Sequence, residues 1–220
     1  MQMTPEELAA QLRCPHGQDA REVGERMNAA NRALTLRAIA LLEIAPGECV
    51  LEIGPGNAAF APVVLADPGV RYVGLDLSAA MIDAAHDRHR DAIERGRARF
   101  IQGDARAMPF ADAGIDRVLA VNTLYFWEAP LQVLGEIARV LRTDGVLCLA
   151  FADAGFMRDM PFAAHGFALH EVAAVVAMMR GAGFGAVDHH VHTERVRSNA
   201  GIEVDRPSHL LVGRRAYRRE

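Results

Sequence analysis

The stretch with the clearest chemical potential is residues 50–58, which read Val-Leu-Glu-Ile-Gly-Pro-Gly-Asn-Ala. A short apolar run that breaks into Gly-x-Gly predicts a buried parallel strand that leads through a tight loop into a helix. Gly54 and Gly56 allow backbone geometry that a side chain would forbid, and they let bare backbone approach a ligand at the N-terminus of the next helix. The stretch therefore predicts a loop that binds a nucleotide.

Two kinds of nucleotide fit this loop. Gly54, Gly56 and Ala59 match the dinucleotide fingerprint, with Asp76 about 20 residues further on as the acid that binds a ribose. Glu52 separates the two, because its carboxylate would repel a pyrophosphate but would attract the ammonium of a methionine moiety beside a sulfonium. S-adenosylmethionine carries both positive charges. We therefore favour S-adenosylmethionine as the cofactor and keep a nicotinamide-dependent oxidoreductase as the alternative.

Further motifs follow in order along most of the chain. They are Glu52-Ile-Gly-Pro-Gly56, Tyr72 to Met81, Gly103-Asp104-Ala105, Met108 to Trp127, Ile137 to Gly145 and Ala182-Gly-Phe184. This series resembles the class I S-adenosylmethionine-dependent methyltransferases, in the small-molecule branch related to the quinone C-methylating enzymes. The resemblance implies an α/β fold with a Rossmann-like, doubly wound seven-stranded sheet, in which six strands are parallel and strand seven is antiparallel. It also implies transfer of a methyl group to a small organic acceptor.

The resemblance also implies a set of cofactor-binding residues near the ends of the strands. Asp76 ends the predicted second strand, where its carboxylate can accept both ribose hydroxyls. Leu77 and Met81 are expected against the adenine, Asp104 is expected to accept the adenine amino group, and the Ala105 backbone is expected to donate to a ring nitrogen. The full predicted set is Glu52, Gly54, Gly56, Asp76, Leu77, Met81, Asp104, Ala105, Asn122 and Met27.

Residues 1–46 precede the nucleotide loop and predict a helical cap that is not part of the sheet. A helix is predicted from about Ala20 to Leu42, with apolar residues at helical spacing. The string from Glu25 to Asn31 resembles the lid segment of the quinone-methylating branch, in which Met27 would cover the cofactor. Gly24 stands where that branch usually has a tyrosine. An ordinary packing helix is the alternative.

Aromatic and soft side chains predict the acceptor pocket. Tyr125 and Trp127 follow the predicted fourth strand, and aromatic rings with polar tips are suited to grip an organic molecule. The connection at residues 153–168 carries Phe156 and Met160, and it predicts a variable wall of the same pocket. Simple core packing of these residues is the alternative.

Methyl transfer from a sulfonium requires no indispensable side chain, because the methyl group is already activated. The protein must mainly align the reactants and exclude water. If the acceptor needs deprotonation, we predict His165, His16 and Tyr125 as the catalytic bases, in that order. A protein that binds S-adenosylmethionine without catalysis and acts through partners is a further alternative.

Two pairs of histidines raise the question of a metal site. His86 and His89 lie three residues apart on a helix predicted from Ser78 to about Glu94, whose neighbouring Asp and Arg residues indicate a solvated face. His190 and His192 share one face of the predicted sixth strand but lack a third ligand at convincing spacing. We therefore predict no metal.

The composition sets the outer limits. With 220 residues, 51% of them hydrophobic, the chain fits one domain, residues 1–220. The resemblance implies that this is a methyltransferase domain in which residues 47–220 form the cofactor-binding core. The net charge of −4 offers no general attraction to nucleic acid. Cys14, Cys49 and Cys148 lack ligand spacing and fit a reducing cytoplasm. No apolar run approaches the roughly 18 residues of a membrane span. We expect a cytoplasmic monomer or homodimer whose partner is a small-molecule methyl acceptor, with no nucleic-acid or membrane partner.

Overall fold

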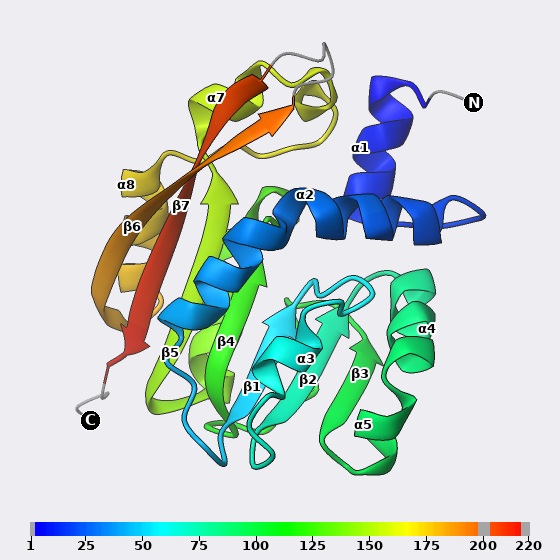
Figure 1. Cartoon of the computed structure of the whole chain (residues 1–220). Helices are drawn as coiled ribbons and strands as arrows, with labels where there is room; N and C mark the ends of the chain where they lie inside the picture. Colours follow the sequence, from blue (N-terminus) through cyan, green and yellow to red (C-terminus); the bar gives the residue numbers. More distant parts are fainter. Residues whose placement is uncertain (1–2, 198–202, 217–220) are drawn as a thin grey trace.

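A seven-stranded sheet is the centre of the computed structural model, which describes residues 3–197 and 203–216. The strands are β1 Cys49–Ile53, β2 Arg71–Asp76, β3 Ala98–Gln102, β4 Ile115–Val121, β5 Leu141–Ala152, β6 Phe184–Arg197 and β7 Glu203–Arg215. Their spatial order is β3-β2-β1-β4-β5-β7-β6 (Figure 1). β7 runs antiparallel to both of its neighbours, and the remaining six strands are parallel. The predicted sheet is confirmed, although the ends of the predicted 1–220 domain lie outside the described residues.

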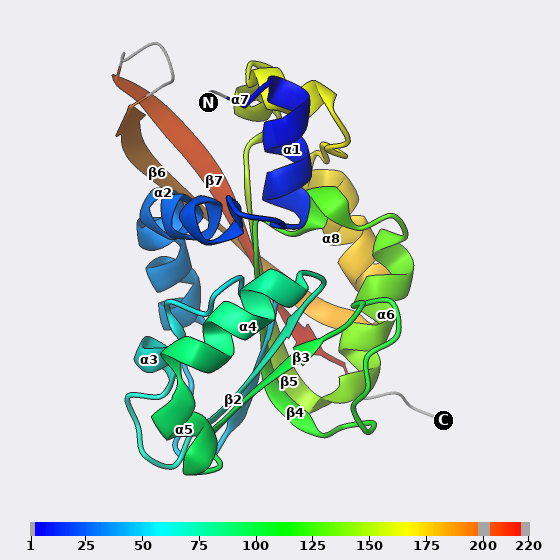
Figure 2. The ribbon, with the colours of Figure 1, turned by 90° about the vertical axis from the view of Figure 1, so that its right-hand side faces the viewer.

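Helices cover both faces of this sheet, as Figure 2 shows. The first face carries α2 (Ala20–Leu41), α3 (Ala61–Val64), α4 (Ala79–Arg88) and α5 (Arg90–Glu94). The second face carries α6 (Pro130–Val140) and α8 (Val172–Gly181). Short elements lie near the carboxyl ends of the strands, namely α1 (Pro5–Arg13), η1 (Leu124–Phe126), α7 (Ala154–Arg158) and η2 (Pro161–Ala164). The sheet is therefore sandwiched between two apolar cores, and its carboxyl edge stays open to a site.

Strand β1 shows how the apolar run builds the two cores. All five of its residues are buried, which fits a central parallel strand. Val50 packs into the core beneath α2, and Leu51 packs into the core beneath α6 and α8. Glu52 follows on the same face as Val50, because side chains alternate along a strand. The strand therefore brings one acid to the carboxyl edge on the α2 side.

The N-terminal segment folds as two helices, one of which lies across the sheet. α1 begins with a capping box, in which Thr4 Oγ1 accepts from the Glu7 backbone and Glu7 Oε2 accepts from the Thr4 backbone. α2 passes over the carboxyl ends of the strands and continues against β4 and β5 (Figure 1). α1 packs against η2, which is more than 140 positions further along the chain. Segments far apart in the sequence thus meet above the sheet.

The helix predicted from Ser78 to Glu94 is divided at His89. The backbone there adopts φ −120° and ψ 26°, which ends α4 and begins α5. The His89 ring is only 7% exposed, stacks on Phe100, and lies with Nε2 2.9 Å from the Ala58 carbonyl oxygen. The prediction that His89 belongs to a solvated face is therefore wrong, because its backbone turns the ring into the core.

Strand β6 extends well beyond the sixth strand predicted around His190 and His192, and β7 pairs with it along most of its length. Beyond the sheet they continue as a two-stranded hairpin in which oppositely charged residues face each other. Arg206 pairs with Glu194, and Arg195 pairs with Asp205. Such cross-strand charge pairs lack the apolar alternation by which a strand is predicted from sequence, so the extension was not expected.

Candidate functional site

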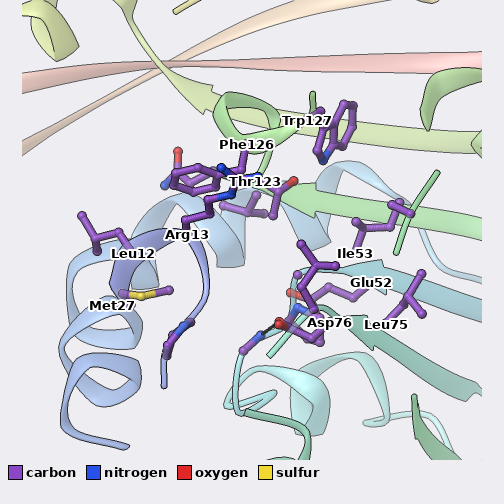
Figure 3. A pocket seen from close by; sticks show the side chains of 18 of the residues that line it. Leu12, Arg13, Met27, Glu52, Ile53, Leu75, Asp76, Thr123, Phe126 and Trp127 are labelled. Carbon is purple, nitrogen blue, oxygen red and sulfur yellow. Dashed lines mark hydrogen bonds between the residues drawn. The ribbon is translucent and has the colours of Figure 1, made fainter. Parts of the chain in front are cut away.

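A cavity of about 310 Å³ lies at the carboxyl edge of the sheet, beneath α1 and α2. Figure 3 shows Glu52 and Asp76 at the sheet side of this cavity, with Leu12, Met27 and Phe126 across from them. Ligands of open α/β sheets bind at this edge, outside the carboxyl ends of the strands. The acids therefore face an apolar wall across a space of ligand size.

The glycine loop brings bare backbone to the cavity. Gly54 and Gly56 have φ of +68° and +57°, a left-handed conformation that side chains rarely adopt. A Cβ atom on Gly54 would lie 2.4 Å from the Thr123 side chain. Gly54 N donates to the Leu75 carbonyl oxygen over 2.8 Å, which fixes the loop to β2. A side chain at the first glycine position would be strained at this φ and would require the Thr123 side chain to move.

Asp76 connects the glycine loop to the start of α4. Its Oδ2 accepts from Gly56 N over 2.9 Å, and its Oδ1 accepts from Ser78 N over 2.8 Å. The residue is 9% exposed, and burial raises the pKa of its carboxyl group while the backbone donors oppose that rise. A carboxylate oxygen can accept more than one hydrogen bond. Asp76 therefore keeps accepting capacity on the cavity side, where two vicinal hydroxyls could be held.

Glu52 is the second buried acid of the cavity and is 6% exposed. The Tyr72 hydroxyl donates to Glu52 Oε2 over 2.6 Å, and Oε1 has no hydrogen-bond partner among the described residues. Burial raises the pKa of Glu52 to about 7, the Tyr72 hydrogen bond lowers it, and the nearby Asp76 charge raises it. A cationic group in the cavity would favour the ionised carboxylate.

The loop after β3 forms one side of the cavity. Gly103, Asp104 and Ala105 line it, together with the 44% exposed Leu77. The Arg106 guanidinium lies 2.7 Å from Asp104 Oδ2, and the Arg106 backbone donates to Oδ1 over 2.8 Å. These contacts lower the pKa of Asp104 and keep it charged. Asp104 thus lies at the edge of the cavity, and Arg106 already donates hydrogen bonds to both of its carboxylate oxygens. Its contact with an adenine stays a prediction.

Two pairs of asparagines hold α2 above the cavity. Asn28 donates to Asn57 of the glycine loop over 2.9 Å, and Asn122 donates to Asn31 over 3.0 Å. Met27, on the same helix, lines the cavity. The predicted lid segment and the predicted Asn122 therefore both lie at the cavity.

Met81 is the one residue of the predicted cofactor set that lies outside the cavity lining. It is fully buried, and its Sδ atom lies 3.8 Å from the position that a Cβ on Gly56 would occupy. A Cβ on Gly24 of α2 would lie 3.0 Å from the same sulfur. Met81 thus fills the space between the glycine loop and α2, because it faces inward from the first turn of α4.

The aromatic run after β4 divides between the cavity and the core. Phe126 and Trp127 line the cavity. Tyr125 is 4% exposed, accepts from the Ala152 backbone and donates to Asn122 Oδ1 over 3.2 Å. Burial raises the pKa of Tyr125 well above its ordinary value. Tyr125 is therefore placed as a structural hydroxyl, and the structure gives it no contact with the cavity.

The remaining predicted bases and pocket residues also lie outside the lining. Phe156 and Met160 are partly buried and pack on the core beneath α6 and α8. His165 is exposed after η2, and the exposed His16 directs Nδ1 to the Cys14 carbonyl oxygen at 2.9 Å. The 153–168 connection instead supports the residues that line the cavity. Within it, η2 packs on α1. Phe162 contacts the ring of Phe167, and Phe167 packs on the cavity residue Phe126.

The end of α1 forms a part of the cavity that the sequence did not predict. Leu12, Arg13 and Pro15 line it. Arg13 Nη2 lies 2.6 Å from Glu128 Oε1, and Arg106 Nη1 lies 2.7 Å from Glu128 Oε2, so one carboxylate joins α1 to the loop after β3. Arg13 and Glu128 are 115 positions apart, and no local sequence pattern signals such a contact.

Residues 3–197 and 203–216 contain neither a cluster of metal ligands nor a helix that could span a membrane. No group of three or more His, Cys, Asp or Glu side chains is arranged there to hold a metal ion. No helix in the same residues has both the length and the apolar character that crossing a bilayer requires.

Several known proteins are similar to this chain in sequence. Residues 51–149 match the family described as the methyltransferase domain. An O-methyltransferase of Aspergillus sclerotiorum, resE, is 29% identical over 126 residues, which are 57% of this chain and 48% of that protein. The 27-O-demethylrifamycin SV methyltransferase of Amycolatopsis mediterranei is 32% identical over 120 residues, which are 54% of this chain and 44% of that protein. The chain spans about half the length of the curated relatives it matches.

A solved structure extends the comparison of the fold beyond the matched segment. Phosphoethanolamine N-methyltransferase 2 of Haemonchus contortus, in complex with phosphomonomethylethanolamine and S-adenosylhomocysteine, superposes with a TM-score of 0.73 at 12% identity. The superposition covers 98% of this chain and 61% of that chain, and it shows the likeness of fold alone. The match over residues 51–149, the relatives and the sheet topology together support a class I S-adenosylmethionine-dependent methyltransferase.

Proposed function

We propose that the chain transfers the methyl group of S-adenosylmethionine, the cofactor of this family, to an oxygen of a small organic molecule. The proposal rests on the shape and the lining of one cavity. Its sheet side holds two buried carboxylates and a glycine loop, and its opposite wall is formed by Leu12, Met27 and Phe126. A cationic nucleoside and an apolar acceptor can therefore share the same space.

The residues of the sheet side fit the cofactor. The free Oε1 of Glu52 would receive the ammonium group, and Asp76 would accept the ribose hydroxyls. Asp104 and the Ala105 backbone would hold the adenine, with Leu77 against its face. A side chain at Gly54 would collide with Thr123, so the glycine keeps the loop in the form that admits a ligand.

The acceptor side has a different task. S-adenosylmethionine supplies a methyl group that is already activated by the sulfonium. Leu12, Met27 and Phe126 would exclude water and press the acceptor against the cofactor site, so that the reacting atoms are aligned in one line. The protein would thus align the reactants and exclude water, and the sulfonium itself would activate the methyl group.

The cavity lining also restricts the acceptor. Glu52 and Asp76 would be occupied by the cofactor, and the other two carboxylates of the described lining are ion-paired, Asp104 with Arg106 and Glu128 with two arginines. No histidine occurs among the described lining residues. We therefore favour acceptors whose hydroxyl ionises easily, such as phenols and enols, because they need no base from the protein.

The names of the relatives support oxygen as the methylated atom. The fungal resE is named an O-methyltransferase, and the name of the other relative, 27-O-demethylrifamycin SV methyltransferase, refers to a substrate that lacks a methyl group on an oxygen. The predicted similarity to quinone C-methylating enzymes stays a prediction beside this proposal. A nicotinamide-dependent oxidoreductase is disfavoured, because Glu52 would face the pyrophosphate of its cofactor.

The test is an activity screen with purified protein, S-adenosylmethionine carrying a labelled methyl group, and a panel of phenols, enols, aliphatic alcohols and amines. We expect labelled product and S-adenosylhomocysteine with phenolic or enolic members, and neither with the Asp76→Ala variant. Release of S-adenosylhomocysteine at background level with every acceptor would favour the non-catalytic alternative. Oxidation of NADH by a carbonyl panel would instead support the oxidoreductase.

A further inference from the structure

A tyrosine outside the cavity lining contacts the buried acid of the cavity. Tyr72 lies in β2, is 1% exposed and donates to Glu52 Oε2 over 2.6 Å. The strand register places Tyr72 beside Val50 and Gly74 beside Glu52, so the hydroxyl reaches the diagonal neighbour on the same face of the sheet. The contact is therefore built into the pairing of two central strands.

The core holds the tyrosine ring in one place. The ring of Phe100 packs against the Tyr72 ring with centroids 5.8 Å apart, and the His89 ring in turn stacks on Phe100 with centroids 5.4 Å apart. A Cβ on Gly74 would lie 2.9 Å from Phe100, which leaves no spare room in this part of the sheet. Burial and the adjacent carboxylate raise the pKa of Tyr72, so its hydroxyl stays protonated and remains a donor.

The surroundings of Glu52 provide little other compensation for its charge. β2 contributes Tyr72 and Asp76, and the negative charge of Asp76 opposes ionisation. β4 contributes the apolar Leu119 opposite Glu52, and α2 contributes the uncharged Thr35 to the same cavity. The Tyr72 hydroxyl is therefore the one described group that acts on Glu52 in favour of the charged form.

We propose that Tyr72 is a positioning residue, whose hydroxyl directs Glu52 to the cavity and favours its charged form, so that a cationic ligand binds with release of a proton. The proton leaves Glu52 for solvent, and no bond of the ligand changes. The inference rests on the proposed function, because the cofactor ammonium is the cation that Glu52 would receive. Tyr72→Phe removes the donor and keeps the ring.

The first experiment uses the ligand-free protein. Infrared spectroscopy follows the carbonyl band of the protonated Glu52 carboxyl group as the pH is raised, and the band is assigned by its absence in Glu52→Gln. We expect a midpoint near pH 7 in the wild type. Because a hydrogen bond to a charged group favours that charge, Tyr72→Phe should raise the midpoint by about one pH unit or more. Phe100→Leu, a packing variant beside Tyr72, should lower thermal stability and leave the midpoint in place.

The second experiment measures binding of S-adenosylhomocysteine by calorimetry, in buffers with different ionisation enthalpies. At pH 7 the wild type should release about half a proton on binding, and at pH 9 almost none. Tyr72→Phe should bind about fivefold more weakly at pH 7, because about one tenth of its Glu52 would be ionised if the midpoint rises by one pH unit. The difference between the two proteins should nearly disappear at pH 9.

An unchanged infrared midpoint in folded Tyr72→Phe would overturn the inference. If that variant does not fold, the wild type alone decides, since equal proton release at pH 7 and pH 9 would also overturn it. A raised midpoint together with no binding of S-adenosylhomocysteine by the wild type would support the role of Tyr72 and overturn the proposed function. The two failures are therefore distinguishable.

Discussion

Two buried carboxylates define the site at the scale of single residues. Asp76 is held by two backbone donors, from Gly56 and Ser78, and Glu52 is held by the single hydroxyl of Tyr72. A buried charge without partners is costly, so these hydrogen bonds explain how an apolar strand end can carry acids. The same acids complement a ligand with a diol at one end and an ammonium at the other.

Replacing Asp76 tests the diol end of the site. We expect Asp76→Ala to weaken binding of S-adenosylhomocysteine by about 100-fold or more, because hydrogen bonds to a charged group are lost. The free energy of unfolding should fall by about 1 to 3 kcal/mol, since buried backbone donors lose their acceptor. Calorimetry and urea unfolding measure the two effects. The control is Asp91→Ala, whose exposed side chain should leave both unchanged.

Replacing Glu52 tests the raised pKa of this acid through stability. The pKa of Glu52 is about 7 in the folded protein against 4.5 for the ordinary group, so folding takes up a proton between these values. The stability that the protonated Glu52 carboxyl group contributes is fully present below pH 4.5 and is lost as the pH rises through 7. Glu52→Gln removes this loss, so the variant should gain up to about 3 kcal/mol over the wild type between pH 4.5 and pH 8. Urea unfolding at pH 5 and pH 8 measures the gain, and a constant difference would contradict it.

At the scale of elements, the cavity depends on helices that precede the sheet in sequence. α2 is tied to the glycine loop by Asn28 and to the loop after β4 by Asn31. α1 is tied to the loop after β4 by the ion pair of Arg13 with Glu128, and the following turn is tied to the start of α4 by a hydrogen bond from Ser78 to the Pro15 carbonyl oxygen. A bound cofactor would therefore be covered by segments that hold through a few polar contacts.

Weakening one of these contacts should change the rate of release. We expect Arg13→Gln to speed dissociation of S-adenosylhomocysteine about two- to fivefold at low salt, because an exposed ion pair contributes up to about 1 kcal/mol. The effect should shrink at high salt. Arg90→Gln is the matched control, since it breaks an exposed ion pair with Asp87 outside the cavity lining. Stopped-flow fluorescence of Trp127 can follow release, and equal rates for both variants would contradict the role of α1.

The elements divide into those that local patterns predict and those that they do not. The run ending at Glu52 and the strand ending at Asp76 follow from buried apolar residues next to glycine and acid signals. The roof formed by Leu12 to Pro15 does not, because its position depends on partners more than 60 positions away. The break at His89 was missed for a related reason, since the charged neighbours suggested a solvated helix and only packing on Phe100 turns the ring inward.

At the scale of the whole molecule, the directions of the strands and the edge of the sheet at which the cavity lies were predictable, and the apolar wall of the cavity was not. Six parallel strands and one antiparallel strand follow from the family resemblance. The predicted acceptor wall at residues 153–168 packs behind the cavity, because Phe167 and Phe162 support Phe126. Soft and aromatic residues serve equally for lining and for support, so sequence alone does not separate the two roles.

The lack of a free base in the described lining leads to a prediction about acceptors. Across a series of substituted phenols of similar size, methylation at pH 7 should become faster as the phenol becomes more acidic, until the phenol is mostly ionised. The rate with a weakly acidic phenol should rise with pH, with a midpoint that follows the phenol. Initial rates across the series measure this, and a midpoint that is the same for all phenols would instead indicate a base on the protein.

We propose that the cavity binds S-adenosylmethionine through Glu52 and Asp76. The test is calorimetric titration of the purified protein with S-adenosylmethionine, S-adenosylhomocysteine and NAD. We expect micromolar binding of the first two ligands, a loss of both in Asp76→Ala, and no binding of NAD. Binding of NAD alone would show the proposal to be wrong, because Glu52 would then tolerate the pyrophosphate that it is expected to repel.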